Sequence, residues 1–338
     1  MQSISPQRGG QLLTIAIPTY NRCSYLELNL NRIHEEMSAL QKEQRSQVKV
    51  YVSDNASTDN TALMLAQHPL HEFIEFEVVC NKENIGAERN AEQGYTNATT
   101  PYVWILGDDD VILPGGLQKV LNILQDQKTD ILYVGNYHFL DNYRDAKYAR
   151  EPRKEGVGIY DKSLMFVRQT NVMLTFISAL IVRSKKSINY DSEIALGSNL
   201  PQLGWILPLL IDGKRFVVIK DWVVAAKGGN SGGYGLIEVF GENLQRIARD
   251  ILKDRLDLAT AIQNGTIVNF FPGFILELRE NKTNFTDTDV KLGLEKVFSD
   301  NWRYYIFLLP LLRLPVFLAY KYNGMLNILR RLCGTWLV

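Results

Sequence analysis

The sequence is poor in the residues that mark several common functional classes. Its 338 residues include three cysteines and four histidines, too scattered for a metal-ligand spacing or a disulfide framework. The 37 basic and 37 acidic residues cancel, so the composition gives no electrostatic reason to expect a nucleic acid as partner. These scarcities argue against a zinc protein, a disulfide-rich domain and a nucleic-acid-binding protein.

Long hydrophobic segments are also missing. Residues 1–13 lack the apolar core of a secretory signal, and no uninterrupted apolar run reaches the roughly 18 residues of a spanning helix. Because few cysteines also fit a reducing compartment, we expect a cytoplasmic protein. Hydrophobic residues make up 46% of the chain and charged residues 22%, a composition typical of a chain with a packed core.

What the sequence does contain is an alternation of short apolar runs and amphipathic segments. The runs 12–18, 48–53, 74–80 and 102–106 predict strands, with helices between them. This alternation predicts a mainly parallel sheet, which binds ligands beyond the carboxyl ends of its strands. Further strands are expected at 130–135, 176–182 and 215–220, and further helices at 117–125, 202–212, 236–264 and 286–298.

Three adjacent carboxylates, Asp108, Asp109 and Asp110, follow the predicted strand 102–106. Buried together, they would repel one another and lose hydration unless a cation lies nearby. Mg²⁺ and Mn²⁺ bind carboxylates together with substrate phosphates, and such an ion stabilises a departing nucleoside diphosphate. The motif indicates a metal-assisted nucleotide site, with a solvated acidic turn as the alternative.

Polar residues also follow the strand predicted at 48–53. Asp54 is the first polar position after it, and Asp54 and Asn55 can accept hydrogen bonds from a nucleotide base. Asp59, further along this segment, is better explained as a helix cap. The segment therefore combines a candidate base contact with ordinary turn chemistry.

Two glycine-containing segments are weaker signals. In 84–90, NIGAERN, Gly86 permits close approach of an anion to a helix N-terminus, and Arg89 can pair with phosphate or with the Asp cluster. The glycine-rich loop 228–235 can close over a substrate, with Lys227 supplying positive charge to a phosphate. An ordinary loop is the alternative in both cases.

Together these pieces resemble the glycosyltransferases of family 2. The resemblance implies a GT-A nucleotide-diphospho-sugar transferase fold, an α/β fold with a Rossmann-like, mainly parallel sheet, over 12–235. It implies a mostly helical C-terminal region over 236–338. Within the family, the chain is most similar to transferases that add deoxyhexoses such as abequose to bacterial surface polysaccharide. The matching segments are TIAIPTYNR (14–22), VSDNASTDNT (52–61), NKENIGAERN (81–90) and YVWILGDDD (102–110).

The resemblance also implies roles for individual residues. Asp54 would hold the nucleotide base, Arg89 would lie near the ribose or diphosphate, and Asp109 would bind Mn²⁺ or Mg²⁺ with Asp110 beside it. The family usually has an acidic residue where this sequence has Gly107, and Asp108 can compensate for it. The remaining expected nucleotide-sugar contacts are Pro18, Thr19, Tyr20, Arg22, Asn55, Asn84, Gly86, Asp108 and Lys227.

The position of the catalytic base departs from the family. The usual base is an Asp in a Glu-Asp pair that opens a helix, and alignment places that pair at Pro201 and Gln202. An amide cannot accept the proton, although Gln202 can still position a substrate hydroxyl. Asp191 and Glu193 are the candidate bases nearby. A different stereochemical course and an impaired chain are the alternatives, but abequose-type relatives also lack this acid, which favours an active enzyme.

The function implied is transfer of a sugar from a nucleoside-diphosphate-sugar donor to a saccharide or lipid-linked saccharide acceptor, in lipopolysaccharide O-antigen or capsule synthesis. A nucleotidyltransferase would share the Asp-bound metal, but it would need a glycine-rich basic loop after the first strand, and PTYNRCSY is not one. A non-catalytic nucleotide-sugar-binding protein is the other alternative, because of Gln202.

The C-terminal segment 302–338 is aromatic, apolar and basic. Pro310, Arg313 and Pro315 interrupt it, which disfavours a straight spanning helix. The pattern suits a helix in an anionic membrane interface, and equally an amphipathic helix packed on the protein's own core. The first alternative would place the protein on the inner face of the cytoplasmic membrane.

Overall fold

The computed structural model describes residues 10–145, 156–184, 192–229, 233–280 and 282–334. The chain forms two compact units that alternate along the sequence. Unit 1 comprises Met1–Ile159, Ile177–Asn189 and Arg215–Gly228, and unit 2 comprises Tyr160–Phe176, Tyr190–Lys214 and Gly229–Val338. The functional division that we expect at residue 235 stays a prediction, because compactness alone does not say where an activity resides.

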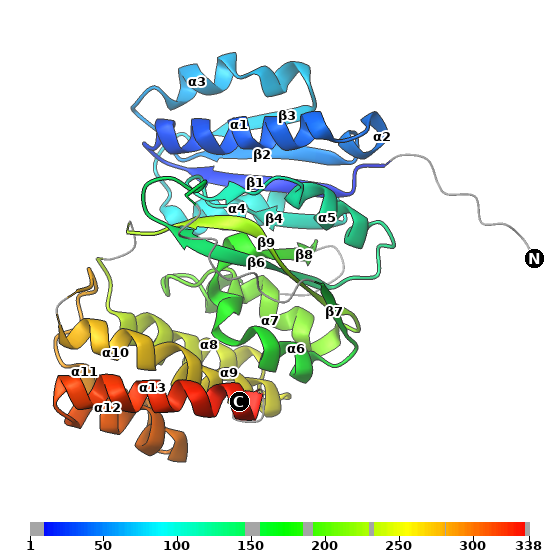
Figure 1. Ribbon diagram of the computed structural model, residues 1–338. Helices are drawn as coiled ribbons and strands as arrows, with labels where there is room; N and C mark the ends of the chain where they lie inside the picture. Colours follow the sequence, from blue (N-terminus) through cyan, green and yellow to red (C-terminus); the bar gives the residue numbers. More distant parts are fainter. Residues whose placement is uncertain (1–9, 146–155, 185–191, 230–232, 281, 335–338) are drawn as a thin grey trace, which may run out of the picture. The chain divides into compact units, whose positions relative to one another are not determined.

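A single nine-stranded sheet forms the centre of unit 1 (Figure 1). Its strands are β1 (Leu13–Thr19), β2 (Val48–Asp54), β3 (Glu75–Cys80), β4 (Tyr102–Ile105), β5 (Val111–Ile112), β6 (Ile131–Phe139), β7 (Val157–Tyr160), β8 (Leu180–Arg183) and β9 (Phe216–Lys227). Their order is β3-β2-β1-β4-β8-β6-β9-β5, and β7 also pairs with β9. β1 to β4 run parallel, whereas β8 runs antiparallel to β4 and β6. The α/β fold is confirmed, and the sheet is mixed beyond its first four strands.

The helices of unit 1 pack on a sheet in which the side chains of β1, β2 and β4 are almost all buried. They are α1 (Cys23–Ala39), α2 (Lys42–Arg45), α3 (Thr61–Gln67), α4 (Ala87–Asn97) and α5 (Gly116–Leu124). Leu26, Leu30 and Ile33 of α1 follow helical spacing and are fully buried. α4 packs on β1, where a Cβ at Gly94 would lie 3.0 Å from Cβ of Ala16. Glycine therefore lets this helix approach the sheet closely.

Asp59 organises the starts of two of these helices. Its Oδ2 accepts a hydrogen bond from the N–H of Cys23, the first residue of α1, at 3.1 Å. Its Oδ1 accepts from the N–H of Thr61, the first residue of α3, at 3.0 Å. The predicted helix-cap role of Asp59 is confirmed. Burial raises the pKa of its carboxyl group, but hydrogen bonds from the Thr61 hydroxyl and from the Cys23 and Thr61 N–H groups outweigh burial and lower it.

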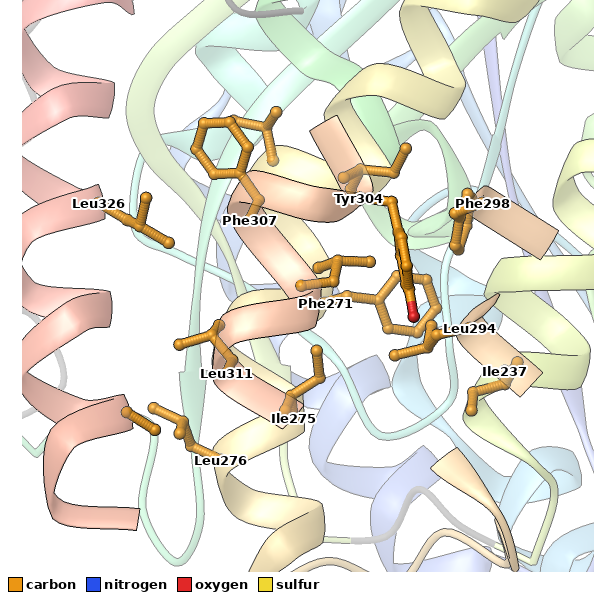
Figure 2. Close-up of a cluster of buried hydrophobic side chains, with 14 of the residues drawn as sticks. Ile237, Phe271, Ile275, Leu276, Leu294, Phe298, Tyr304, Phe307, Leu311 and Leu326 are labelled. Atoms are coloured by element: carbon orange, nitrogen blue, oxygen red, sulfur yellow. The ribbon is translucent and has the colours of Figure 1, made fainter. Parts of the chain in front are cut away.

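Unit 2 is helical in its described part. Its α-helices are α6 (Ser163–Thr170), α7 (Leu203–Asp212), α8 (Leu244–Ile251), α9 (Leu256–Gly265), α10 (Phe271–Arg279), α11 (Val290–Phe298), α12 (Leu309–Arg313) and α13 (Val316–Cys333). Short 3₁₀ or π turns occupy Asn171–Thr175, Ser192–Ile194, Ile237–Asn243, Thr266–Phe270 and Tyr304–Leu308. Figure 2 shows part of its core, where Phe271, Phe298, Phe307 and Leu311 meet side chains of neighbouring helices.

Several predicted elements differ in extent from the observed ones, among them the strand expected at 130–135, which continues to Phe139, and the helix expected at 286–298, which begins at Val290. The strand expected at 176–182 begins as a 3₁₀ turn at Ile177–Ala179, because Ser178 binds the backbone of Gly107. The strand expected at 215–220 continues to Lys227. It does so through an irregularity opposite Gly135, where a Cβ would lie 2.3 Å from the Asp221 carbonyl oxygen. The helix expected at 236–264 is broken between Ile251 and Leu256.

No helix in the described ranges is both long enough and apolar enough to cross a membrane.

Candidate active site

The best-formed polar cluster of unit 1 joins the segments after β1 and β4. These strands are parallel neighbours, so the residues that follow them meet at one edge of the sheet. Thr19 Oγ1 donates to Asp108 Oδ2 at 2.8 Å. The Arg22 guanidinium donates to Asp108 Oδ1 at 2.9 Å and to Asp109 Oδ2 at 2.5 Å. Two carboxylates therefore converge on one cationic group.

Burial makes two carboxylates of this cluster, Asp108 and Asp110, costly to ionise. Burial raises the pKa of Asp108 to about 6, with the Arg22 charge opposing the shift and the Asp109 charge adding to it. Burial, and then the Asp109 charge, also raises the pKa of Asp110 well above its usual range. A cation close to this cluster would lower both values, because it stabilises the ionised forms.

The Asp cluster is held in a tight turn by two neighbours, Ser178 and Asn29. Gly107 donates its N–H to Ser178 Oγ at 2.9 Å. Asn29 Nδ2 donates to the carbonyl oxygens of Gly107 and Asp110, at 3.0 and 2.7 Å. A Cβ at Gly107 would lie 3.0 Å from Asp110 Oδ2 and 3.2 Å from Asp109 Oδ1. An acidic side chain at position 107 would therefore crowd the carboxylates that follow it.

Asp54 lies at the same edge of the sheet, since it is opposite Thr19 in the parallel register of β1 and β2. It is buried, and its Oδ1 accepts from the N–H of Ser57 at 3.1 Å. This is the hydrogen bond of a turn. The proposed contact of Asp54 with a nucleotide base stays a prediction.

Asn55 belongs to a chain of side-chain amides. It donates to Asn84 Oδ1 at 2.7 Å and accepts from Asn81 Nδ2 at 3.1 Å. Asn84 Oδ1 also accepts from the N–H of Gly86, whose φ of +88° is a conformation that glycine adopts without strain. The amides fix the loop that leads into α4.

The remaining residues that are predicted to contact the nucleotide sugar differ in their exposure to solvent. The Arg89 side chain is 52% exposed, and its guanidinium lies 4.0 Å from Glu92. Tyr20 is 41% exposed, and Pro18 is half-buried within β1. Lys227 lies in β9, outside the expected loop. Its Nζ donates to the Leu140 and Gly228 carbonyl oxygens, and residues 230–232 of that loop lie outside the described ranges.

Metal binding was predicted at Asp109 and Asp110. Asp110 Oδ1 accepts the N–H of Lys227 at 2.9 Å and its carboxyl group is buried, whereas Asp109 already faces the Arg22 cation. In the described ranges, no three His, Cys, Asp or Glu side chains are arranged to hold a metal ion. Any divalent ion at the cluster would therefore need oxygen ligands from a substrate or from water.

The candidate catalytic residues belong to unit 2. Gln202 precedes α7, is 3% exposed, and donates from Nε2 to the Thr175 carbonyl oxygen at 2.6 Å. Glu193 is exposed in the Ser192–Ile194 turn. Asp191 lies outside the described residues. Their roles in the reaction stay predictions.

Sequence reasoning missed two residues that shape the cluster, Asn29 and Ser178. Asn29 lies on the buried stripe of α1 with Leu26, Leu30 and Ile33, and it is 1% exposed. A polar residue in an apolar helical stripe is a recognisable signal. Ser178 offered no such signal, because it lies within a run that predicts a plain strand.

Comparison with known proteins identifies similar chains. The sequence profile of glycosyl transferase family 2 matches residues 14–189. Abequosyltransferase RfbV of Salmonella typhimurium is 26% identical over 208 residues, which are 57% of this chain and 59% of that protein. The chain thus matches less than two thirds of the length of this relative.

Solved structures of S. aureus TarS have a similar fold. The fragment 1–349 is 17% identical, with a TM-score of 0.55, and the match covers 94% of this chain and 89% of that chain. A longer TarS structure is 18% identical, with a TM-score of 0.59, and the match covers 94% of this chain and 54% of that chain. The 1–349 fragment has also been solved in complex with UDP-GlcNAc and with UDP. At these identities the likeness shows the fold alone.

Proposed function

Since this chain belongs to glycosyl transferase family 2, we propose that it transfers a sugar from a nucleoside-diphosphate-sugar donor to a saccharide or lipid-linked saccharide acceptor. The likeness to an abequosyltransferase supports a role in bacterial surface polysaccharide synthesis. The TarS complexes support UDP-sugars as the first donors to test. A lipid-linked acceptor would bring the enzyme to a membrane surface.

One observation carries the proposal: Thr19, Arg22, Asp108 and Asp109 gather beyond the carboxyl ends of β1 and β4. The strand ends are where such sheets bind nucleotides. The guanidinium of Arg22 can turn toward a diphosphate, while Asp108 and Asp109 can accept a metal ion in its place. Asp54 and Asn55, at the neighbouring strand end, would contact the base.

The two carboxylates fit Mn²⁺ or Mg²⁺, because they already converge on one cation and their burial favours a positive neighbour. Asp109 would hold the ion, Asp108 would lie beside it, and Asn29 and Ser178 would keep the turn in place. When bound, the ion would neutralise the departing diphosphate. The acceptor hydroxyl would lose its proton to Glu193 or Asp191, with Gln202 in a positioning role.

Donor binding tests the proposal. We expect one nucleotide sugar to raise the unfolding temperature in the presence of Mn²⁺, because a ligand stabilises the state that it binds. Asp109→Asn should abolish this Mn²⁺-dependent shift without changing the unfolding temperature of the free protein by more than a few degrees. Asp126→Asn, at an exposed aspartate paired with Arg215, is the control and should keep the shift. Equal shifts in wild type and Asp109→Asn would remove the metal role.

Donor hydrolysis separates the alternatives. Slow release of free sugar from the stabilising donor would support a transferase. Binding without any release of sugar would support a nucleotide-sugar-binding protein. Release of a nucleoside monophosphate or pyrophosphate would support a nucleotidyltransferase.

A further inference from the structure

α13 carries large apolar side chains on a face that is open to solvent. Leu318, Met325, Leu329 and Leu332 are spaced by seven, four and three residues, so they lie on one side of the helix. Phe317 and Ile328 adjoin them. We call these six residues the exposed apolar face. Exposure reaches 63% at Phe317, 61% at Ile328 and 79% at Leu332, although burial in a core is usual for such side chains.

The opposite side of α13 packs against the hydrophobic core of unit 2. Ala319 and Leu326 are its two buried residues, and both belong to the core cluster of that unit. Figure 2 shows Leu326 pointing from α13 toward Phe307 and Leu311. The helix is thus packed through a narrow stripe, which leaves its apolar residues elsewhere uncovered.

The charged side chains of the segment that contains α13 are all basic. Residues 302–338 contain five cations and no aspartate or glutamate. Lys321 and Arg331 are exposed, and Lys321 lies among the apolar residues at helical spacing from Phe317, Met325 and Ile328. Glu280, which follows the last residue of α10, accepts a hydrogen bond from Tyr320, but its charge is already paired with Lys282 at 3.0 Å. The five cations are Arg303, Arg313, Lys321, Arg330 and Arg331.

Two aromatic side chains of the same basic segment, ahead of α13 in the sequence, are also exposed. Trp302 and Tyr305 are each 53% exposed, and the Arg303 guanidinium lies 4.6 Å from the Trp302 ring centroid. A segment that combines amphipathic aromatics, cations and an exposed apolar helix face is typical of a chain that lies at a lipid headgroup layer.

We propose that the exposed apolar face of α13 binds an anionic lipid bilayer, with the helix axis parallel to the membrane plane. The apolar side chains would enter the headgroup boundary, and Lys321 and Arg331 would contact acidic headgroups. A second copy of the chain is a poorer partner, because a two-fold interface would bring the same cations against each other. The inference rests on α13 alone, so it can fail while the proposed sugar transfer holds.

Vesicle co-sedimentation of the full chain tests this proposal. We expect the protein to sediment with phosphatidylcholine vesicles that contain phosphatidylglycerol, to bind pure phosphatidylcholine more weakly, and to be released by high salt. Replacing both exposed cations, Lys321→Gln with Arg331→Gln, should weaken binding about fivefold for each charge removed. Lys296→Gln, in α11, removes an exposed cation outside this surface and should bind as the wild type does.

A second set of variants tests the apolar contribution. Phe317→Ser with Ile328→Ser and Leu332→Ser should abolish sedimentation, whereas Leu292→Ser, at a 64% exposed leucine of α11, should not. If the triple variant fails to fold, Leu332→Ser alone should weaken binding severalfold. The proposal is overturned if the wild type does not sediment with anionic vesicles, or if both the charge variant and the apolar variant bind as it does. It is also overturned if the wild type is a dimer in solution that the triple substitution converts to monomers without affecting vesicle binding.

Discussion

At the residue scale, Asp54 has a turn hydrogen bond and a predicted contact with a nucleotide base, and a single substitution can separate the two. Its Oδ1 accepts the Ser57 N–H, and its position at the strand end suits a nucleotide base. Asp54→Asn keeps an oxygen for the turn but replaces the charged acceptor. We expect nucleoside diphosphate binding to weaken by roughly 1–3 kcal/mol, the cost of an imperfectly paired polar group, while stability changes little.

Titration of UDP, CDP, GDP and dTDP by calorimetry measures this effect. Asp126→Asn is again the control for loss of a surface charge. Unchanged affinity for all four nucleotides in Asp54→Asn would reduce Asp54 to a turn residue.

Gln202 is the residue at which the resemblance to the family predicts an Asp. Its amide donates to the Thr175 carbonyl oxygen from a buried position, so it already has a structural partner. Gln202→Ala should lower the free energy of unfolding by about 1–3 kcal/mol, because it leaves that carbonyl group unpaired and opens a cavity. Urea unfolding checks the value.

Gln202→Met separates the two causes, since methionine fills the volume without donating a hydrogen bond. We expect it to be intermediate in stability between wild type and Gln202→Ala. The pH dependence of donor hydrolysis should be the same in all three proteins, and a shifted profile in either variant would contradict a role limited to positioning.

At the scale of elements, a buried ion pair links α1 to the start of α5. Glu36 receives a hydrogen bond from Arg32 at 2.8 Å and also accepts from the N–H groups of Gly115 and Leu117. Its carboxylate therefore caps α5 and neutralises Arg32 at once. Glu36→Ala should destabilise the protein by about 3–5 kcal/mol, because it leaves a buried guanidinium without this partner.

Glu35 provides a matched control. It pairs with the same Arg32, but its side chain is 53% exposed. Glu35→Ala should cost at most about 1 kcal/mol, as solvent-exposed pairs do. Equal losses of stability for the two substitutions in urea unfolding would contradict the capping role of Glu36.

At the scale of the whole molecule, the stability of folding should depend on one buried histidine. Burial, and then the charges of His34 and His71, lowers the pKa of His68 to about 4. An unfolded histidine titrates near 6.5, so the unfolded state binds more protons between these two values. The contribution of His68 to stability is then complete above about pH 6.5 and is lost as the pH drops toward 4, by up to about 3 kcal/mol.

His68→Asn isolates this contribution. Asparagine does not titrate here, and it can accept the Leu70 N–H that His68 Nδ1 accepts at 3.3 Å. The stability advantage of the wild type over this variant should shrink as the pH falls from 6.5 to 4.5. Parallel pH dependences of the two proteins would show that His68 is not the linked group.

The strands β1, β2 and β4 can be predicted from the local sequence. The runs that end at Thr19, Asp54 and Ile105 are apolar, of strand length, and followed by polar residues. Such patterns specify buried parallel strands, because burial on both faces requires apolar residues at consecutive positions. The position of Asp54 and Asp108 at one sheet edge follows from this alternation.

The sequence by itself thus determined the family, the α/β fold and the polar residues gathered at the strand ends, because these depend on patterns within short segments. Only the tertiary structure decided what each polar group contacts. Arg22 lies between two carboxylates, Asn29 reaches the Asp turn from α1, and Gln202 donates to a carbonyl group. These contacts join residues up to 87 positions apart, as between Arg22 and Asp109, and such distances in sequence are closed only when helices and strands pack.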